Sequence, residues 1–458
     1  MGDLTDRVRK ALRGAGAATS ADLQEICAAS QASISRALSP LLASGEVLRV
    51  GRGRSQAYVM PRRVDRVSST GTIPITKIDR AGKASEFGTV IPVVEGRCWV
   101  EEFDEPLTQL HGGLPWFLAD MRPQGFLGRA FAHARKDFGL AENPEHWSDD
   151  DVLKALCQAG EDLPGNLIVG ERSFARHMHA APAQRATPHD YPQLAELAMR
   201  GALPGSSAGG EQPKFCTARE ADGHPVLVKF SPAGTSAADR RWADLLVCEH
   251  LALTVLLDAG VPAASTRLFE GGGRVLLEVE RFDRTPQGRI GMVSLLAFDA
   301  EYIGHMDNWA ASAERMVTRG LMRTADAERL RLLEAYGQQI GNTDRHYGNI
   351  SLVIDQRGNW QLAPAYDMLP MIYAPVAGEI VPRDGFDPAR FVPSAQTLRV
   401  WDQARELATT FWSRAAQDRR ISEEFRASAQ RHAESLRSRA ELQQPAADEP
   451  AFQRERPS

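Results

Sequence analysis

The chain has 458 residues, a length that suggests two to four domains of ordinary size. Hydrophobic residues make up 43% of it and charged residues 25%, which is typical of globular proteins and leaves enough apolar side chain for packed cores. The net charge of −5 is mild, so no general electrostatic attraction to nucleic acid or to a membrane surface follows from it.

The cysteines indicate a reducing compartment. All five are single, none forms a CxxC pair, and the odd number argues against a full disulfide framework. The N-terminal segment MGDLTDRVRK has no apolar signal-peptide core, and no run of about 18 apolar residues occurs in the sequence. Asp6 occupies the position where a myristoylation signal needs Ser or Thr. We therefore expect a soluble, cytoplasmic protein without a membrane partner.

Charge is distributed unevenly along the chain. Residues 1–66 hold eleven Lys or Arg against six Asp or Glu, a net charge of +5, so the remaining residues carry −10. A basic head on an acidic body indicates two partners of different kinds.

Helical periodicity is clear within this head. Three helices are predicted from their apolar faces, which hold Leu4, Val8, Ala11 and Leu12 in the first, Leu23 and Ile26 in the second, and Ile34, Leu38, Leu41 and Leu42 in the third. Ser20 and Ser30 are the predicted N-caps of the second and third helices, and Pro40 is expected to break or kink the third. Two short strands, Val47–Val50 and Gln56–Met60, follow around the turn GRGRS. Three helices and a hairpin predict a winged helix.

The body continues with strands and then with helices. Residues 68–103 are strand-like, most clearly in GTIPITKI and GTVIPVV, and mixed helix follows to about residue 170. Residues 223–282 alternate strand, helix and strand, and residues 286–415 are predicted to be mainly helical apart from a hairpin near 350–363. From about residue 440 the chain is polar and contains proline, which predicts disorder.

The segment IGNTDRHYGNISLVIDQRGNWQLAPAYDML, residues 340–369, is typical of phosphotransfer chemistry. Asp344 precedes Asn349 by five positions, the spacing of the protein-kinase catalytic loop, and Asp367 follows a predicted hairpin. Phosphoryl transfer needs a carboxylate to orient the attacking hydroxyl, and an amide oxygen and a second carboxylate to hold Mg²⁺. Asp355 and Gly358 are interpreted as turn residues.

Upstream segments are suited to binding a nucleotide. Lys229 lies in the predicted strand of GHPVLVKFSP, where it is either a solvated edge residue or a clamp on phosphates, and Glu249 on the next helix could pair with it. The run VLLEVERFDR places Glu280 and Phe282 where backbone groups could contact adenine. The loop GSSAGGEQPKF is either a plain linker or a phosphate-binding loop, with Ser206, Ser207, Gly209 and Gly210 as its candidate residues.

Together and in this order, the motifs resemble the HipA-like serine/threonine kinases, the toxins of bacterial toxin–antitoxin pairs. The resemblance covers about residues 70–415 and rests on LPWFLADMRPQGFLGR, EDLPGNL, SSAGGEQPKF, LVKF, VERFDR, GNTDRHYGN and PAYDMLP. It implies an α+β, two-lobed protein-kinase-like fold that uses ATP and Mg²⁺. The family phosphorylates proteins, including an aminoacyl-tRNA synthetase in its best known members, and thereby arrests growth.

The resemblance also implies roles for individual residues. Asp344 becomes the catalytic aspartate, Asn349 and Asp367 the Mg²⁺ ligands and Lys229 the phosphate-binding lysine. The other nucleotide contacts are Glu280, Phe282, Ser206, Ser207, Gly209, Gly210 and His346. The regulatory autophosphorylated serine is Ser206 or its neighbour Ser207, because the spacing to the QxK element differs by one residue from some relatives.

The head departs from the usual arrangement, in which a separate antitoxin supplies the helix-turn-helix, and resembles fused members of the YjjJ type. If it reads DNA, the predicted contacts are Gln31, Ser33, Ser35 and Arg36 in the major groove and Arg52 and Arg54 on the wing. The alternative is a winged helix that docks proteins or forms dimers.

Five segments result: a winged helix-turn-helix (1–66), a β-rich subdomain (67–170), a kinase N-lobe (171–284), a helical C-lobe (285–439) and a disordered tail (440–458). The expected partners are a protein substrate, DNA and, as an option, a second copy in a homodimer. Two alternatives to a protein kinase stay open: a transcription regulator with an inactive or ligand-sensing kinase body, and a small-molecule phosphotransferase, against which the absence of an H-G-D loop argues.

Overall fold

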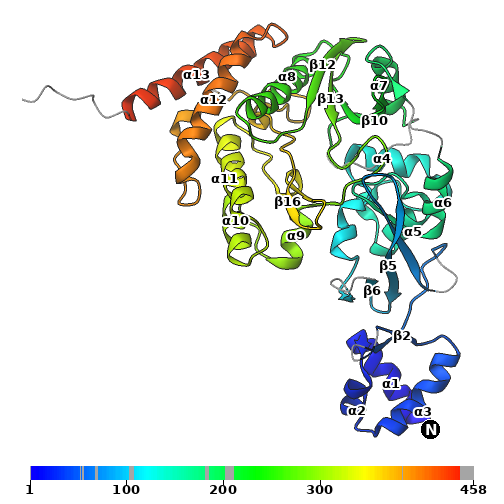
Figure 1. Ribbon diagram of the computed structural model, residues 1–458. Coiled ribbons are helices and arrows are strands. Elements are labelled where there is room, and N and C mark those ends of the chain that lie inside the picture. The colour runs from blue at the N-terminus through cyan, green and yellow to red at the C-terminus, as the bar shows by residue number, and fades with distance from the viewer. Residues whose placement is uncertain are drawn as a thin grey trace, which may run out of the picture. The chain divides into compact units, whose positions relative to one another are not determined.

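The computed structural model describes residues 2–51, 53, 56–67, 71–102, 108–180, 185–201, 211–383 and 385–443 (Figure 1). They belong to two compact units. The first comprises Met1–Lys229, Glu280–Gly304 and Ser351–Asn359, and the second comprises Phe230–Val279, His305–Ile350 and Trp360–Ser458. No helix within the described ranges combines the length and the apolar character that crossing a membrane requires.

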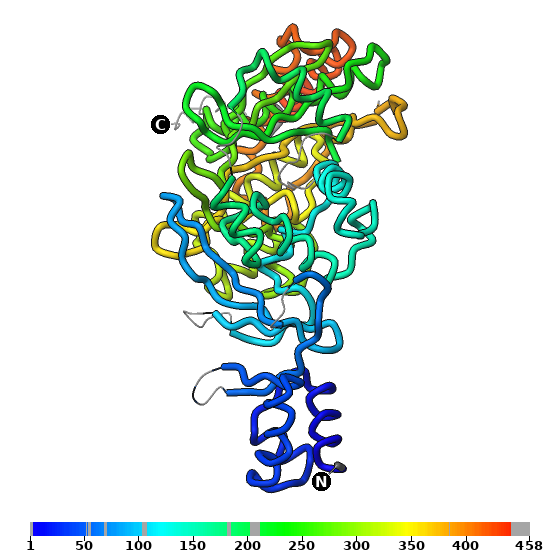
Figure 2. Tube along the Cα trace, turned by 90° about the vertical axis from the view of Figure 1, so that its right-hand side faces the viewer, coloured from blue at the N-terminus to red at the C-terminus, as the bar shows by residue number. Residues whose placement is uncertain are grey.

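The first unit begins with three helices and a small sheet, drawn in blue in Figure 2. The elements are α1 (Gly2–Ala15), β1 (Ala17–Ala18), α2 (Ser20–Cys27), α3 (Gln31–Ala43), β2 (Leu48–Val50) and β3 (Ala57–Val59), and the strand order is β1-β3-β2. Apolar side chains from all three helices share one core, in which Val8, Leu12, Leu23 and Ile34 are fully buried. These are the helices and the hairpin that periodicity predicted, with β1 as an additional strand.

Two local predictions for this head, the cap of α2 and the burial of Ile26, were wrong. The N-cap of α2 is Thr19, which forms a reciprocal capping box with Asp22, so the helix begins one residue earlier than a Ser20 cap implies. Ile26 is 56% exposed, and Cys27 takes the inward position instead. The α3 helix continues through Pro40 to Ala43, because Pro40 lies on the exposed side, where water can bond the carbonyl that loses its partner.

A second sheet follows, and the hairpin of the head packs against it. Its strands are β4 (Ile73–Ile78), β5 (Ala84–Val93), β6 (Arg97–Glu102), β7 (Gln109–His111) and β8 (Leu167–Val169), in the order β7-β6-β5-β4-β8. Val50 and Val59 of the head share a core with Ile91, Val93 and Trp99 of this sheet. The head and the sheet are therefore joined by buried apolar surface as well as by the chain.

The remainder of the first unit is mixed. It contains helices α4 (Gly125–Ala134), α5 (Asp149–Ala159), α6 (Glu171–His179), α7 (Tyr191–Met199) and α9 (Leu295–Tyr302), and strands β9 (Arg185–Ala186), β10 (Lys214–Arg219), β11 (Pro225–Phe230), β14 (Met292–Ser294) and β15 (Ser351–Ile354). The β10 strand pairs antiparallel with β11 and parallel with β9, and β14 pairs antiparallel with β15.

The second unit is mainly helical. Its elements are α8 (Ala237–Asp258), the hairpin β12 (Thr266–Gly271) and β13 (Arg274–Glu280), α10 (Trp309–Thr318), α11 (Thr324–Gln339), β16 (Trp360–Leu362), α12 (Trp401–Gln417) and α13 (Glu423–Gln443). Helices α12 and α13 lie side by side (Figure 1) and bury Phe411, Trp412 and Phe425. The strand, helix and strand predicted for residues 223–282 are present as β11, α8 and the β12–β13 hairpin.

Two stretches differ from the predicted helix content. In the described parts of the first stretch, residues 370–383 and 385–400, the helical structure is limited to short 3₁₀ turns, because prolines at 370, 375, 382, 388 and 393 prevent longer helices. The α13 helix continues to Gln443, past the point where disorder was expected to begin, and residues 444–458 lie outside the described part.

Candidate functional site

The predicted catalytic loop begins where α11 ends. Gly341 follows the helix with φ +75°, and a Cβ built at this position would lie 2.9 Å from both Ile372 and Phe386. Glycine is therefore required by the backbone conformation and by the packing. The loop continues through Asp344 into the 3₁₀ turn Tyr347–Asn349 and then into β15.

Asp344 and Asn349 lie against each other. The Asn349 Nδ2 donates to the Asp344 carbonyl oxygen at 2.9 Å and to Oδ2 of the Asp344 carboxylate at 3.2 Å. Both bonds use the amide nitrogen of the buried Asn349 side chain, so neither bond involves its side-chain oxygen, Oδ1. The Asp344 side chain is 49% exposed.

Two hydrogen bonds join the catalytic loop to the segment that contains Asp367. The Asn342 Nδ2 donates to the Asp367 carbonyl oxygen at 3.4 Å, and the Tyr366 hydroxyl donates to the Gly348 carbonyl oxygen at 3.0 Å. Asp367 has φ +52°, a left-handed conformation that Asp tolerates better than most residues do. All three residues of the predicted metal and catalytic set thus belong to two segments that are held together.

Buried groups from α10 and α11, and the exposed Asp307 just before α10, anchor the other side of the loop. Arg345 Nε donates to Glu334 Oε1 at 3.1 Å, and Trp309 Nε1 donates to the His346 carbonyl oxygen at 3.2 Å. The Tyr347 hydroxyl donates to Asp307 Oδ1 at 3.1 Å. These contacts fix the backbone from residue 345 to residue 347.

His346, predicted as a nucleotide contact, bonds within the loop. Its Nδ1 accepts from the Gly348 backbone N–H at 3.0 Å, which places the ring proton of the neutral imidazole on Nε2. That Nε2 lies 3.7 Å from Asp344 Oδ1. The imidazole therefore presents its N–H on the side of the Asp344 carboxylate.

Lys229 lies in β11 of the first unit and is 4% exposed. It stands directly opposite Lys214 of β10, which is 3% exposed. Opposed residues of an antiparallel pair point to the same face of the sheet, so the two lysine side chains share one face. Lys214 was not predicted, although a lysine between Pro213 and Phe215 at the start of an apolar strand is a signal for it.

Glu280 ends β13, and its carboxylate is occupied by an ion pair. Oε1 of Glu280 accepts from Arg219 Nη2 at 2.6 Å, and the next backbone N–H, of Arg281, donates to the Pro225 carbonyl oxygen at 3.2 Å. Phe282 is half-buried. A nucleotide contact of this segment would therefore use other backbone groups or the Phe282 ring. Glu249 is fully buried on α8 in the second unit.

The segment after Phe282 is anchored by buried charges. Asp283 pairs with Arg281 at 2.9 Å and with Arg284 at 2.6 Å, and Arg284 also donates to Asp162 and to the Leu163 carbonyl oxygen. Burial would raise the pKa of Asp283, but the two guanidinium groups hold it well below its usual range. The segments EDLPGNL and VERFDR, about 120 positions apart in sequence, are thus direct structural partners.

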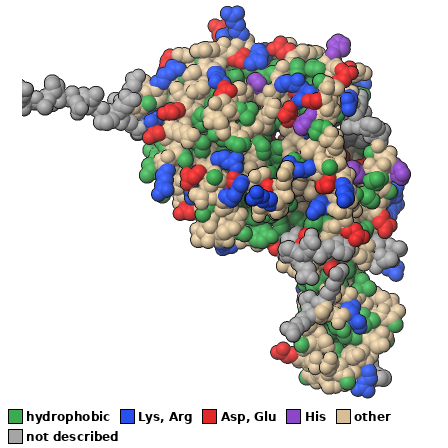
Figure 3. All heavy atoms as spheres, viewed as in Figure 1, with side chains coloured by type: hydrophobic (Ala, Val, Ile, Leu, Met, Phe, Trp, Pro, Cys, Tyr) green, Lys and Arg blue, Asp and Glu red, His purple; other side chains and the backbone are tan. Residues whose placement is uncertain are grey.

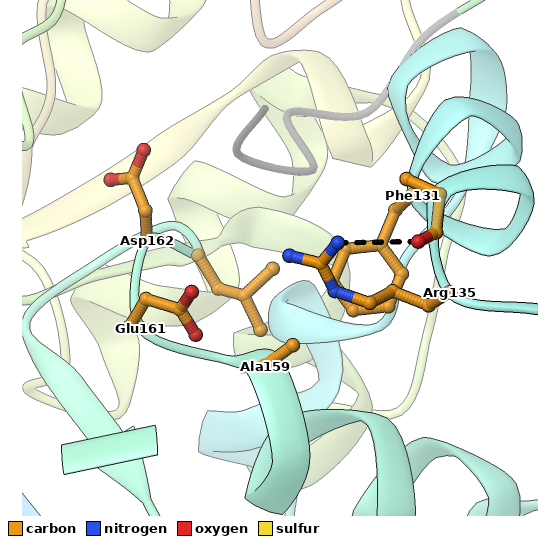
Figure 4. Close-up of a pocket in the computed structure, with 7 residues that line it drawn as sticks. Phe131, Arg135, Ala159, Glu161 and Asp162 are labelled. Carbon is orange, nitrogen blue, oxygen red and sulfur yellow. Dashed lines mark hydrogen bonds between the residues drawn. The ribbon is translucent and has the colours of Figure 1, made fainter. Parts of the chain in front are cut away.

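A pocket with a volume of about 70 Å³ lies beside this ion cluster (Figure 4). Phe131, Arg135, Ala159, Glu161 and Asp162 line it, together with Ala134 and Leu163. One oxygen of Glu161 is bound by Arg176 at 2.5 Å, and Arg135 donates to the Ala134 carbonyl oxygen. None of the predicted site residues belongs to this lining.

The predicted DNA contacts on α3 are only partly available. Gln31, Ser35 and Arg36 are exposed. Ser33 is half-buried and bonds the N-cap Ser30, with 3.0 Å between the two hydroxyl oxygens, so its hydroxyl serves the helix start. Six predicted residues lie outside the described part of the chain: Arg52, Arg54, Ser206, Ser207, Gly209 and Gly210.

Comparison with known proteins yields two family matches. Residues 206–441 match the HipA-like C-terminal domain, and residues 69–178 match the middle domain of the YjjJ-like toxin. Toxin YjjJ of Escherichia coli is 36% identical over 448 residues, which cover 95% of this chain and 98% of that protein. A putative kinase of Sinorhizobium fredii, Y4dM, is 29% identical over 283 residues, which cover 57% of this chain and 63% of that protein.

Among solved structures, a chain of the Shewanella oneidensis MR-1 toxin–antitoxin complex of HipA, HipB and operator DNA superimposes with a TM-score of 0.52. The sequence identity is 15%, and the superposition covers 80% of this chain and 97% of that chain. At this identity the likeness concerns the fold. The predicted α+β, kinase-like fold of the HipA type is confirmed.

Proposed function

This chain belongs to the family of HipA-like toxins, with the middle domain of the YjjJ-like branch, and from that membership we propose that it is a serine/threonine protein kinase that uses ATP and Mg²⁺. The observation that carries the proposal is the joined pair of segments in the second unit, in which Asn349 bonds Asp344 and Asn342 bonds the backbone of Asp367.

In the proposed reaction, the hydroxyl oxygen of a serine or threonine attacks the γ-phosphorus of ATP. The bond between that phosphorus and the β,γ-bridging oxygen breaks, and ADP leaves. Asp344 orients the hydroxyl and accepts its proton, which suits a half-exposed carboxylate whose position Asn349 fixes. Nε2 of His346 lies 3.7 Å from Oδ1 of the same carboxylate.

The donor set fits Mg²⁺. Asn349 and Asp367 offer an amide oxygen and a carboxylate, the hard oxygen ligands that this cation prefers, and the amide nitrogen of Asn349 already serves Asp344. The bound cation would neutralise charge on the phosphates. We assign Lys229 and Lys214 to the phosphate chain, and Glu280, Phe282, Ser206, Ser207, Gly209 and Gly210 to the rest of the nucleotide.

The proposal extends to regulation. Phosphorylation of Ser206 or Ser207 would add negative charge to the Gly-rich loop and lower its affinity for ATP phosphates. The head would bind DNA through Gln31, Ser35 and Arg36 and so regulate transcription. We further propose that the kinase arrests growth by phosphorylating a cellular protein, for which an aminoacyl-tRNA synthetase is one candidate. A role for DNA is supported by the structurally similar chain from the complex of HipA, HipB and operator DNA.

Labelling with ATP tests the proposal. The purified full-length chain is incubated with Mg²⁺ and ATP labelled at the γ-phosphate, beside the Asp344→Asn and Asp355→Asn variants. Asp355 is a matched control because its carboxylate accepts from the Arg357 and Asn359 backbone N–H groups of the hairpin turn and was not predicted to take part in catalysis. We expect label on the Ser206–Ser207 peptide in the wild type and in Asp355→Asn, and about a hundredfold less in Asp344→Asn.

Equal labelling of all three proteins would contradict the kinase assignment. Absence of label from all three, with DNA binding retained, would favour the transcription regulator with an inactive kinase body. Chelation of Mg²⁺ by EDTA should abolish the label in the wild type.

A further inference from the structure

Asn342 is a fully buried polar residue to which the sequence motifs assigned no role. It lies two positions before Asp344 and accepts from the Asp344 backbone N–H through Oδ1 at 2.9 Å. This is an Asx turn, in which a side chain bonds the backbone two residues ahead. The same amide donates through Nδ2 to the Asp367 carbonyl oxygen at 3.4 Å.

The orientation of this amide is determined by its partners. One partner is a backbone N–H, which can only donate, and the other is a carbonyl oxygen, which can only accept. A flipped amide would face nitrogen with nitrogen and oxygen with oxygen and would lose both bonds. The oxygen end of Asn342 thus serves Asp344, whereas the nitrogen end serves the segment of Asp367, where it also contacts Met368 Sδ at 3.8 Å.

The contact with Asp367 involves a residue in an unusual conformation. Asp367 has φ +52°, which a non-glycine residue holds only when its surroundings fix the peptide. Asn342 bonds the carbonyl of that residue, and Tyr366 bonds Gly348 from the position just before it. Because the side-chain direction of Asp367 follows from its backbone, the bond from Asn342 helps to aim the Asp367 carboxylate.

We propose that Asn342 is a positioning residue that sets the catalytic aspartate Asp344 and the metal-binding aspartate Asp367 relative to each other. The inference rests on the proposed function, because these two carboxylates receive their roles there. Asn342 acts through the backbone of both segments and contacts neither substrate nor metal. Loss of its side chain should impair metal binding and phosphoryl transfer together.

A buried amide that merely stabilised the fold would behave differently, and Gln339 provides the comparison. Gln339 is 1% exposed, lies three positions earlier and donates through Nε2 to the Trp401 carbonyl oxygen, away from both aspartates. Gln339→Ala should lower the melting temperature without changing the labelling rate of the folded protein. Asn342→Ala should lower both.

Two variants separate the two ends of Asn342. Asn342→Ala removes both bonds, whereas Asn342→Asp retains an acceptor for the Asp344 N–H and removes the donor to Asp367. The full-length proteins are compared by the labelling rate at saturating ATP and by amide hydrogen exchange at Asp344. Affinity for Mn²⁺ in the presence of a non-hydrolysable ATP analogue is measured by electron paramagnetic resonance for the wild type, Asn342→Ala and Gln339→Ala.

We expect labelling at least tenfold slower in both Asn342 variants than in Gln339→Ala. The Asp344 amide should exchange faster in Asn342→Ala but stay protected in Asn342→Asp, and the Mn²⁺ affinity of Asn342→Ala should fall severalfold. Labelling and Mn²⁺ affinity that match Gln339→Ala would overturn the inference. If neither Asn342 variant folds, amide hydrogen exchange is measured at Asp344 in the wild type alone. Rapid exchange there would refute the inference, because the bond from the Asp344 N–H to Asn342 should protect this amide.

Failure of the proposed function gives a different pattern. If the wild type transfers no label but binds Mn²⁺ more tightly than Asn342→Ala does, the kinase assignment is refuted and the positioning role of Asn342 remains. If the wild type and the Asn342 variants transfer label at the same rate, the kinase assignment stands and the positioning role of Asn342 is refuted.

Discussion

Gly337 faces the side chain of Arg345, one of the anchors of the catalytic loop. A Cβ at Gly337 would lie 2.6 Å from Arg345 Cδ. Arg345 has little freedom to retreat, because its Nε is bonded to Glu334 and its Nη1 to the Asn342 carbonyl oxygen. Glycine in a helix normally costs about 1 kcal/mol relative to alanine, so here contact with Arg345 outweighs helix propensity.

Gly337→Ala is therefore expected to lower the free energy of unfolding by about 1–3 kcal/mol, through overpacking, and to slow labelling. Gly14→Ala is the matched control, because no atom lies within 4 Å of the Cβ position at Gly14 in α1. It should raise the free energy of unfolding by about 0.5–1 kcal/mol. Urea titrations measure both, and stabilisation by Gly337→Ala would contradict the packing argument.

Asp307 makes the stability of the loop anchor dependent on pH. Hydrogen bonds from Arg315 lower the pKa of Asp307 to about 2 against the effect of burial, and the Asn308 backbone and the Tyr347 hydroxyl contribute further. Its unfolded pKa is about 3.9. A depressed folded pKa stabilises the protein above the unfolded value, and this stabilisation is lost as the pH falls toward 2.

Asp307→Asn should therefore be less stable than the wild type at pH 5, and the difference should shrink as the pH falls from 4 toward 2. Melting temperatures measured at intervals between pH 5 and pH 2.5 test this expectation. Parallel curves for the two proteins would show that Asp307 contributes nothing specific in acid.

At the scale of elements, the hairpin of the head and the strands β5 and β6 form one apolar layer. Val59 of β3 and Val93 of β5 are both fully buried in it. Backbone bonds join Arg62 to Pro92 and Val94 to Met60, and the Arg62 guanidinium pairs with Asp150. The head and the middle sheet should therefore gain and lose structure together.

Val93→Asp tests that coupling, since it places a carboxylate in the shared layer from the side of the sheet. We expect a loss of at least about 3 kcal/mol of stability, and faster amide exchange throughout α1, α2 and α3. Ile26→Asp is the control, because Ile26 is 56% exposed and should tolerate the charge. Unchanged exchange in the helices of the head after Val93→Asp would mean that the head folds independently.

At the scale of the whole molecule, Lys and Arg side chains are interspersed with Asp and Glu side chains over the face seen in Figure 3. Although the whole chain has a net charge of −5, residues 1–66 carry a net charge of +5. Contacts between such a head and DNA phosphates release counterions, so the affinity should fall steeply with salt.

The full-length chain is first used to select a DNA duplex from a random library. Arg36→Met should lower the affinity for this duplex by about tenfold and reduce the slope of log affinity against log salt concentration by about 0.9. Lys10→Met changes the net charge equally, from an exposed position on α1, and should have the smaller effect. Fluorescence anisotropy between 50 and 300 mM salt measures both. Equal effects of the two substitutions would indicate that α3 does not enter the groove, and the head would then be better explained as a protein-docking module.

Local features were predictable from the sequence because their causes lie within one turn or one loop. The apolar faces of α1 and α3 follow from spacings of three and four residues, and the Ser30 cap lies three positions before its partner Ser33. Asp344 and Asn349 are five positions apart and bond each other directly. The turn at Asp355 and Gly358 is equally local, with φ +83° at Gly358.

Only the tertiary structure decided the contacts between distant segments. The bond of Asn342 with Asp367 spans 25 positions, that of Arg284 with Asp162 spans 122, and the shared layer of Val59 and Val93 joins β3 of the head to β5 of the second sheet. Such pairs leave no period or spacing in the chain, because each is set by how whole elements pack. The sequence therefore determined which residues were predicted to form the phosphotransfer site, and packing determined which buried side chains contact their segments.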